Sequence, residues 1–434
     1  MAEARALNDS RALGDTATLQ CVSPVARFLL RQAVRKFSGR QHGYKYRGLP
    51  LVMLLAMVAS MPSKATEPDA QQVDTAKATI QAAAAPAKPA MPIVTEDGTV
   101  QIPGFAAPFS RFASEEARRS FLYEHSPAFY ASPIARMQQL PIAEQRATLD
   151  KYYLEPLIAK AKARYAVKIE PRSIGGVYTE VITPAEGVTR DKDQRVLINL
   201  HGGGFSLGAR TNGQLESIPI VGLGKYRVVA VDYRQGPEHR FPSGSEDVAT
   251  VYRELLKSYR PEHIGIFGCS AGGLLAAQAL AWFQKAALPT PGAVGIFCAG
   301  AGHLGDGDSG YLAPALNGRP VPQPGKAGEL MRLAYFEGAD PGDPLVSPVD
   351  HPAVLAAFPP TLLVTATRDM AMSATLYTQR QLVKAGVEVD LHVWDGLQHY
   401  FFGDVDLPES QEAFQVMVDF FDGHLTGTGR TATR

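Results

Sequence analysis

From residue 177 onward, apolar positions occur in short runs that alternate with stretches of helical periodicity. Several runs, such as 228–231, are continuously apolar, which is typical of strands that are buried on both faces. Strands are expected at 177–182, 195–200, 226–231, 263–267, 293–298, 361–365 and 387–394. Helices are expected at 246–257, 271–285, 370–384 and 409–421. This alternation predicts one large α/β domain with a mainly parallel sheet flanked by helices.

Upstream, residues 108–165 have a helical pattern with many aromatic side chains, which suit either a core or a lid over an apolar site. Ser114 is placed to cap a helix that opens with two glutamates. Pro141 suits the first turn of a second helix, which Pro156 is expected to interrupt. Residues 300–358 are rich in Gly, Pro and Asp, and they predict a second insertion around one helix near 328–335.

A short apolar run at residues 49–59 follows the basic start of the chain. Lys45 and Arg47 precede it and Ser63-Lys64-Ala65 follows it, which is the order of a secretory signal peptide. A transmembrane helix needs about 20 apolar residues, and no cysteine stands directly after the run to carry a lipid, so no stable membrane anchor is expected. The protein is therefore expected to be periplasmic or secreted, or cytoplasmic if this leader is not a functional signal.

The charge distribution supports the same division. The 43 basic and 43 acidic side chains cancel, but residues 1–65 hold ten basic and three acidic ones, a charge of +7. The rest of the chain carries −7 and argues against nucleic acid as a partner. The expected order is a leader with signal peptide at 1–65, an Ala/Pro-rich linker at 66–105, an α/β domain at 106–425 and a flexible tail at 426–434.

The segment Gly268-Cys269-Ser270-Ala271-Gly272 follows an expected strand and opens an expected helix. This is the context of a nucleophile elbow, in which glycines two residues either side avoid a collision at the sharp turn. The middle residue of an elbow points outward, so Ser270 rather than Cys269 is the expected nucleophile. A second serine, Ser309 in Gly307-Asp308-Ser309-Gly310, has no strand before it and no expected helix after it.

A second glycine-rich motif, His201-Gly202-Gly203-Gly204-Phe205, directly follows the expected strand at 195–200. Successive glycines let backbone N–H groups approach a substrate oxygen, as an oxyanion hole requires. The predicted donors are Gly202, Gly203 and Ala271.

Two further side chains complete the expected chemistry. Asp369 lies just past the strand at 361–365, and His399 follows the strand at 387–394. The chain order Ser, Asp, His is that of α/β-hydrolase triads. Asp395 is a rival acid because it lies four residues from His399, but it shares the loop of the base, and Asp369 is preferred.

The numbers and positions of cysteine and histidine give little support for disulfide or metal chemistry. The chain has three cysteines, of which Cys269 and Cys298 lie at apolar strand ends and are expected to be buried thiols. The ten histidines form no metal-binding motif, so neither a metal nor another cofactor is expected.

Taken together, these motifs resemble the hormone-sensitive-lipase-like esterases, also called bacterial lipase family IV or the α/β-hydrolase fold-3 group. The likeness rests on 201–205, on Asp232-Tyr233-Arg234 with Pro237-Glu238-His239, and on 268–273, and it covers about 108–424. It implies an α/β-hydrolase fold with an N-terminal helical cap at about 108–165, and a structural rather than catalytic role for Asp232, Arg234, Glu238 and His239. The sequence departs from the family pattern at Cys269, where Asp or Thr is usual.

The expected function is a serine carboxylic-ester hydrolase that forms an acyl-enzyme on Ser270 and acts on small esters with short to medium acyl chains. Two alternatives stay open at this point. One is a non-catalytic ligand-binding protein on the same scaffold, and the other is a hydrolase of acylated amines or peptides. The sequence leaves the oligomeric state and the natural substrate undetermined.

Overall fold

The computed structural model describes residues 92–104, 106–326 and 333–425. The chain divides into two compact units, Met1–Pro103 and Gly104–Arg434. In the first unit the described residues form a small antiparallel hairpin of β1 (Ile93–Val94) and β2 (Val100–Gln101). The predicted leader at 1–65, most of the predicted linker and the predicted tail at 426–434 lie outside the described residues.

The second unit is built on an eight-stranded sheet with the order β10-β9-β8-β7-β5-β6-β4-β3. Strands β6, β5, β7, β8, β9 and β10 run parallel, whereas β4 pairs antiparallel with both β3 and β6. The prediction of a mainly parallel sheet is confirmed. The strands are β3 (Val167–Ile174), β4 (Val177–Pro184), β5 (Val196–Leu200), β6 (Arg227–Val231), β7 (Ile264–Cys269), β8 (Ala293–Phe297), β9 (Thr361–Arg368) and β10 (Val389–Gln398).

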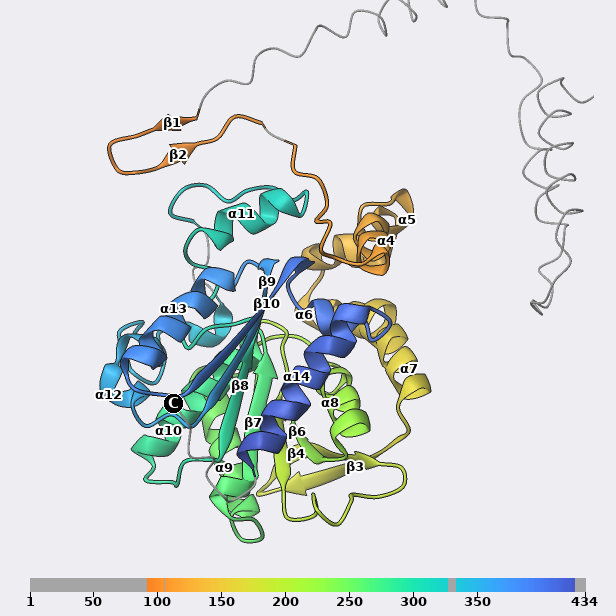
Figure 1. Ribbon diagram of the computed structural model, residues 1–434, viewed down its shortest axis with the longest axis vertical. Helices are drawn as coiled ribbons and strands as arrows, with labels where there is room; N and C mark the ends of the chain where they lie inside the picture. The colour runs from red at the N-terminus through yellow and green to blue at the C-terminus, as the bar shows by residue number, and fades with distance from the viewer. Residues whose placement is uncertain (1–91, 105, 327–332, 426–434) are drawn as a thin grey trace, which may run out of the picture. The chain divides into compact units, whose positions relative to one another are not determined.

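Helices cover both faces of this sheet (Figure 1). On one face α9 (Ser243–Leu255) and α10 (Ala271–Lys285) pack with the strands, and α13 (Met372–Lys384) joins them. On the other face α8 (Thr211–Gly224) lies beside α14 (Pro408–His424). Because both faces are covered, β5, β7 and β8 are buried along their whole length, which explains their continuous apolar runs.

Among the strands of the large sheet and the helices that cover it, α8 and β3 were not predicted from the sequence. Helix α8 contains Pro219 and several glycines, which have low helix propensity, yet most of its residues are buried against the sheet and the neighbouring helices α7 and α14. Strand β3 is largely exposed at the sheet edge and contains Pro171, so its sequence lacks a regular alternation. In both cases tertiary contacts outweigh the local signal.

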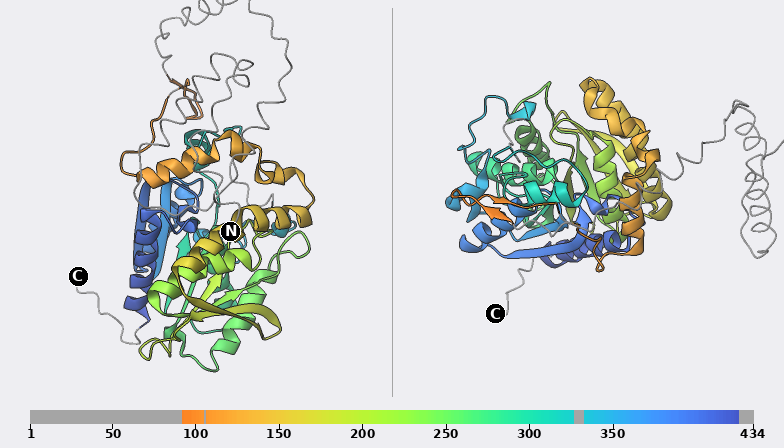
Figure 2. Two further views of the ribbon diagram at one scale, coloured as in Figure 1. Left: turned by 90° about the vertical axis from the view of Figure 1, so that its right-hand side faces the viewer. Right: turned by 90° about the horizontal axis from the view of Figure 1, so that it is seen from above.

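The cap is made of α4 (Glu115–Glu124), α5 (Pro127–Tyr130), α6 (Ile142–Leu149) and α7 (Glu155–Arg164). Helices α4 and α5 lie at the end of the unit where β9 and β10 finish, and α7 lies along the side of the unit against α8 (Figure 1 and Figure 2). Ser114 is the N-cap of α4, as predicted, and its side chain accepts a hydrogen bond from the N–H of Ala117. Pro141 is the N-cap of α6 rather than part of its first turn. Pro156 does not end the helical path, because a π-helical turn, Asp150–Leu154, leads into α7 and places the proline in its first turn.

The described part of the second insertion contains a helix that was not predicted, α11 (Ser309–Leu316). The helix expected near 328–335 lies mostly outside the described residues, and Ala334–Phe336 form a short 3₁₀ turn. A four-residue helix, α12 (Pro352–Leu355), precedes β9. None of the helices in the described ranges combines the length and apolarity that a membrane crossing requires.

Candidate active site

Ser270 occupies the turn between β7 and α10, with φ 57° and ψ −122°. A methyl group at Gly268 would lie 2.2 Å from the carbonyl oxygen of Leu200, and one at Gly272 would lie 1.7 Å from the same oxygen. Only glycine therefore fits either side of Ser270, which is the physical reason predicted for the motif. The turn leaves Ser270 partly exposed at the carboxyl end of the sheet.

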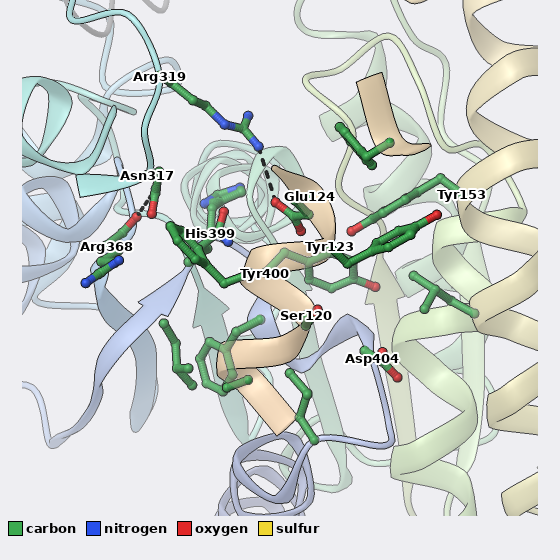
Figure 3. Close-up of a pocket in the computed structure, with 18 of the residues that line it drawn as sticks. Ser120, Tyr123, Glu124, Tyr153, Asn317, Arg319, Arg368, His399, Tyr400 and Asp404 are labelled. Carbon is green, nitrogen blue, oxygen red and sulfur yellow. Dashed lines mark hydrogen bonds and ion pairs between the residues drawn. The ribbon is translucent and has the colours of Figure 1, made fainter. Parts of the chain in front are cut away.

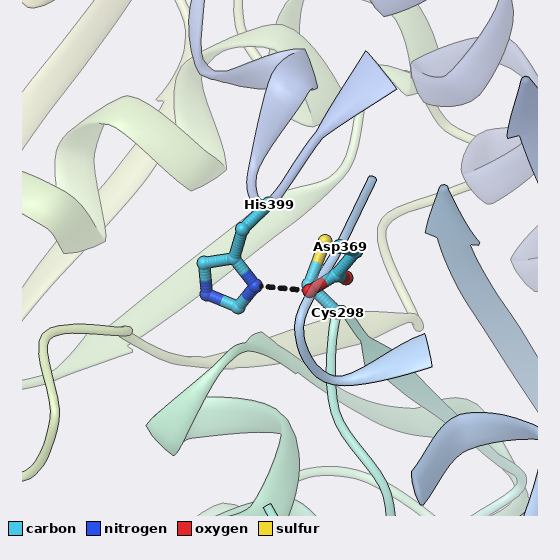
Figure 4. A group of neighbouring side chains, drawn as sticks. All are labelled: Cys298, Asp369 and His399. Atoms are coloured by element: carbon cyan, nitrogen blue, oxygen red, sulfur yellow. Dashed lines mark hydrogen bonds and ion pairs between the residues drawn. The ribbon is translucent and has the colours of Figure 1, made fainter. Parts of the chain in front are cut away.

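Asp369 and His399 meet at the same edge of the sheet, just beyond β9 and β10 (Figure 4). His399 Nδ1 donates to Asp369 Oδ1 at 2.7 Å. The buried carboxylate also accepts from Thr365 Oγ1 at 3.0 Å and from the N–H of Ala371 at 2.8 Å. His399 Nε2 has no hydrogen-bond partner among the residues that the structure describes, so it is free to accept a proton.

The electrostatics of the pair favour an ionised acid and a basic imidazole. Desolvation disfavours charge on His399, but the charge of Asp369 and its hydrogen bond outweigh this and raise the pKa of His399 above its ordinary value. Burial likewise opposes ionisation of Asp369, and His399 with the donors from Ala371 and Thr365 still lowers the pKa of that carboxyl. Asp369 thus stays charged while it orients the base.

The rival acid Asp395 has other partners. It accepts hydrogen bonds from Ser110 Oγ and, at 3.1 Å, from Thr367 Oγ1. The acid that contacts His399 is therefore the preferred one, Asp369.

Two buried thiols lie behind these groups. Desolvation raises the pKa of Cys269 and Cys298, so both are protonated thiols rather than thiolate nucleophiles. Cys298 lies next to the Asp369–His399 pair (Figure 4). Its Sγ, a carboxylate oxygen of Asp369 and a ring nitrogen of His399 all lie within 4.8 Å of one another. Because the acid and the imidazole are already hydrogen-bonded to each other, this group is better suited to proton transfer than to metal binding. The proximity of Cys298 had no signal in the sequence.

The glycine loop differs in one residue from the predicted oxyanion hole. The N–H of Gly202 donates to Glu216 Oε1 at 2.9 Å, so it is not available to a substrate. The N–H groups of Gly203 and Gly204 have no acceptor within the described part of the chain. Ala271 is the first residue of α10, where N–H groups lack intrahelical acceptors. The predicted donor set is therefore revised to Gly203, Gly204 and Ala271.

A cavity of about 620 Å³ opens beside His399 and Tyr400 (Figure 3). Glu124 from α4 and Arg319 form an ion pair of 3.5 Å there, which links the cap to the second insertion. The lining is mainly aromatic and apolar and comes largely from the cap, including Phe109, Phe121, Tyr123, Phe129, Tyr152, Tyr153 and Leu157. Such a lining suits the apolar part of a small ligand.

Comparisons with known proteins agree with this geometry. A family model described as the alpha/beta hydrolase fold matches residues 197–403. The crystal structure of esterase E25 is 32% identical, with a TM-score of 0.63, and the match covers 75% of this chain and 98% of that one. The chain belongs to the hormone-sensitive-lipase-like esterases.

Two other relatives of this esterase point the same way. An esterase of the bacterial hormone-sensitive lipase family is 25% identical, with a TM-score of 0.61, over 72% of this chain and 99% of that one. An acetyl-hydrolase of Streptomyces hygroscopicus is 29% identical over 269 residues, or 59% of this chain and 82% of the relative. The protein is a carboxylesterase-type hydrolase.

In this esterase, residues of the Asp-Tyr-Arg and Pro-Glu-His motifs form hydrogen bonds and ion pairs with the glycine loop, with α9 and with the cap. Tyr233 donates to the carbonyl oxygen of His201 at 2.8 Å, and Arg234 pairs with Asp247 at 2.9 Å. Arg146 of the cap pairs with Glu238 at 2.7 Å. These contacts hold the glycine loop and the cap to the sheet.

Ser309 of the esterase is also structural. A helix does follow it, contrary to the expectation, because α11 begins at this residue. The buried hydroxyl donates to the carbonyl oxygen of Met370 at 2.7 Å and accepts from the N–H of Ser373 at 2.9 Å. It lies under the loop that follows Asp369 and ties that loop to the insertion.

Proposed function

We propose that this esterase cleaves carboxylic esters by nucleophilic catalysis, with Ser270 as nucleophile, His399 as general base and Asp369 as the group that orients His399. The hydrogen bond of 2.7 Å between His399 and a buried Asp369, at the sheet edge that also carries the Ser270 elbow, is the observation that supports this most strongly. His399 accepts the hydroxyl proton on its unpartnered Nε2.

In the first half of the reaction Ser270 Oγ bonds to the ester carbonyl carbon while its proton passes to His399. The carbonyl oxygen becomes an oxyanion and accepts hydrogen bonds from the N–H groups of Gly203, Gly204 and Ala271. Collapse of this intermediate breaks the ester C–O bond, and His399 returns the proton to the departing alcohol. Water then attacks the acyl-enzyme with the same base, releases the acid and restores Ser270.

The preferred substrates are small esters with short to medium acyl chains. The aromatic cavity next to His399 has a volume of about 620 Å³, which lies in the size range of small-molecule sites. The cap covers this cavity from α4 through α7 and limits the length of chain that it holds. The relative named as an acetyl-hydrolase supports a short acyl group.

We also propose that residues 1–65 direct the esterase out of the cytoplasm and are removed. The apolar run at 49–59, its basic flank and Ser63-Lys64-Ala65 support this assignment.

The mechanism is tested with p-nitrophenyl butyrate and two serine variants. Ser270→Ala is expected to lose nearly all turnover, by roughly 10⁴-fold or more, because the nucleophile is absent. Ser309→Ala, which changes the serine of the Gly307–Gly310 segment, is expected to remain an active esterase because this hydroxyl only ties two loops together. Circular dichroism checks that both variants are folded, and undiminished turnover by folded Ser270→Ala would rule the mechanism out.

The same assay on esters of increasing acyl length tests the substrate class. We expect kcat/KM to peak at short to medium chains and to decline beyond about ten carbons, as the cap-bounded cavity fills. A rising kcat/KM for longer chains would make the protein a lipase rather than an esterase.

A further inference from the structure

A glutamate is buried directly behind the glycine loop. Glu216 lies on α8 with 3% exposure, and its Oε1 accepts the N–H of Gly202 at 2.9 Å. Its Oε2 accepts from Asn199 Nδ2 at 2.8 Å. The loop residue that it holds adjoins the nucleophile, since a methyl group at Gly202 would lie 3.4 Å from Ser270 Cβ.

The other side of the same loop residue is held as well. The carbonyl oxygen of Gly202 accepts from His201 Nδ1 at 2.7 Å and from Asn212 Nδ2 at 3.3 Å. A trans peptide points its N–H opposite to its carbonyl oxygen. The direction of the Gly202 carbonyl therefore sets the direction of the Gly203 N–H, which belongs to the same peptide unit and has no acceptor among the described residues.

We propose that Glu216 is a positioning residue of the oxyanion hole: its hydrogen bond to Gly202 fixes the loop so that the N–H groups of Gly203 and Gly204 are aimed at the oxyanion formed on Ser270. This inference rests on the proposed function, because it assigns Glu216 a part in stabilising the intermediate of that reaction. Glu216 does not touch the substrate; it acts through the backbone of Gly202.

Burying the carboxyl group of Glu216 costs desolvation free energy, which argues against a role that is limited to filling space. An apolar residue of the same size would fill the space between α8 and the loop without desolvating a carboxyl group. Desolvation raises the pKa of Glu216 to about 8, although hydrogen bonds from Gly202, Asn199 and the backbone of Cys269 oppose the shift. What the carboxyl adds over an apolar residue is an acceptor for an N–H group that is otherwise unpaired next to the nucleophile.

Two variants of Glu216 distinguish the effect of its acceptor oxygen from the effect of its side-chain volume. Glu216→Met keeps the volume and removes the acceptor, so the Gly202 peptide is released; kcat is expected to fall roughly 10- to 100-fold with little change in KM. Glu216→Gln keeps an acceptor oxygen and is expected to stay within about threefold of the parent enzyme. Should Glu216→Met fail to fold, Glu216→Asp, which withdraws the carboxylate by one methylene, is expected to show the same loss.

Affinity for an alkyl trifluoromethyl ketone provides a readout that general destabilisation does not move. Ser270 Oγ bonds to the ketone carbon, the proton passes to His399, and the carbonyl oxygen becomes an oxyanion. The inhibition constant is expected to weaken in Glu216→Met by the same factor as kcat. Glu180→Met is the matched control, because Glu180 is also buried and accepts from Gln214 of α8 at 2.9 Å, with no bond to the glycine loop.

Parent-like kcat and ketone affinity in Glu216→Met would overturn the inference, and so would an equal loss in Glu180→Met. If the proposed function is wrong, Ser270→Ala is as active as the parent enzyme. If only the inference is wrong, Ser270→Ala is inactive and Glu216→Met is as active as the parent enzyme.

Discussion

At the residue scale, two opposing effects act on the pKa of His399. Desolvation lowers this pKa, and the buried, charged Asp369 raises it by more. The pKa of His399 is raised above its ordinary value despite burial, because Asp369 supplies both charge and a hydrogen bond. Catalysis requires the neutral imidazole as base. A group whose pKa is raised holds its proton to higher pH, so the acidic limb of the activity profile moves upward.

For the parent enzyme we therefore expect kcat/KM to fall with decreasing pH around a midpoint that lies above about 6.5, the ordinary pKa of an unperturbed histidine. Asp369→Asn removes the charge that raises this pKa, so the midpoint should move to lower pH. The same change should lower kcat by about 10⁴-fold, because the tautomer of His399 is no longer fixed. The pH profile of kcat/KM measures both effects, and an unmoved midpoint in Asp369→Asn would contradict this account of His399.

The triad candidates could be predicted because each follows a recognisable strand or motif. Ser270 has its glycines on either side, and Asp369 and His399 come directly after apolar runs. The bond between Gly202 and Glu216 could not be predicted, since it joins a loop to the buried face of a helix whose sequence contains proline and glycines. The proximity of Cys298 to Asp369 depends likewise on how β8 and β9 pair.

At the element scale, the junction of β7 and α10 depends on the absence of side chains at two positions. A methyl group at Gly268 would lie 2.2 Å from the Leu200 oxygen and 2.5 Å from the carbonyl carbon of Gly272. Both are backbone atoms, which cannot rotate away as a side chain can. Gly268 is the register partner of Leu200 in β5, so β5, β7 and the start of α10 approach one another too closely to admit a side chain here.

Gly268→Ala is therefore expected to lower the free energy of unfolding by roughly 3 kcal/mol or more and to displace Ser270. Urea denaturation measures the loss. Gly104→Ala is the control, because a methyl group there meets no atom within 4 Å and the change should stay within about 0.5 kcal/mol. Equal stability of the two variants would show that the junction tolerates a side chain.

Most strands and helices of the second unit were predictable for the same physical reason that they are stable. Buried strands such as β5 and β7 are continuously apolar, and α9 and α14 have a clear apolar face. The cap was harder, since its helices carry exposed aromatic residues such as Tyr123 and Tyr130 and gain their order from contacts with the domain. Examples are Ser114 with Glu409 and Arg146 with Glu238.

At the scale of the whole molecule, the neutral total charge hides a division. Residues 1–65 carry +7, and the rest of the chain, which contains the esterase fold, carries −7. If the leader is removed on export, the working enzyme is mildly acidic and has no electrostatic attraction to nucleic acid or to anionic membrane surfaces.

Expression of the full chain in a bacterium with a periplasm is expected to yield a protein that begins near residue 66. N-terminal sequencing of the purified enzyme and fractionation of the cells measure this directly. A protein that keeps its first residue and stays in the cytoplasm would refute the export proposal and leave the mechanism untouched.

The most direct test of the central claim is to identify the atom that becomes covalently bound. Diethyl p-nitrophenyl phosphate phosphorylates an activated serine and releases p-nitrophenol, and peptide mass spectrometry locates the adduct. We predict one adduct per active enzyme, on Ser270, formed in step with the loss of esterase activity. An adduct on Cys269 or Ser309, or complete inactivation with Ser270 unmodified, would contradict the account.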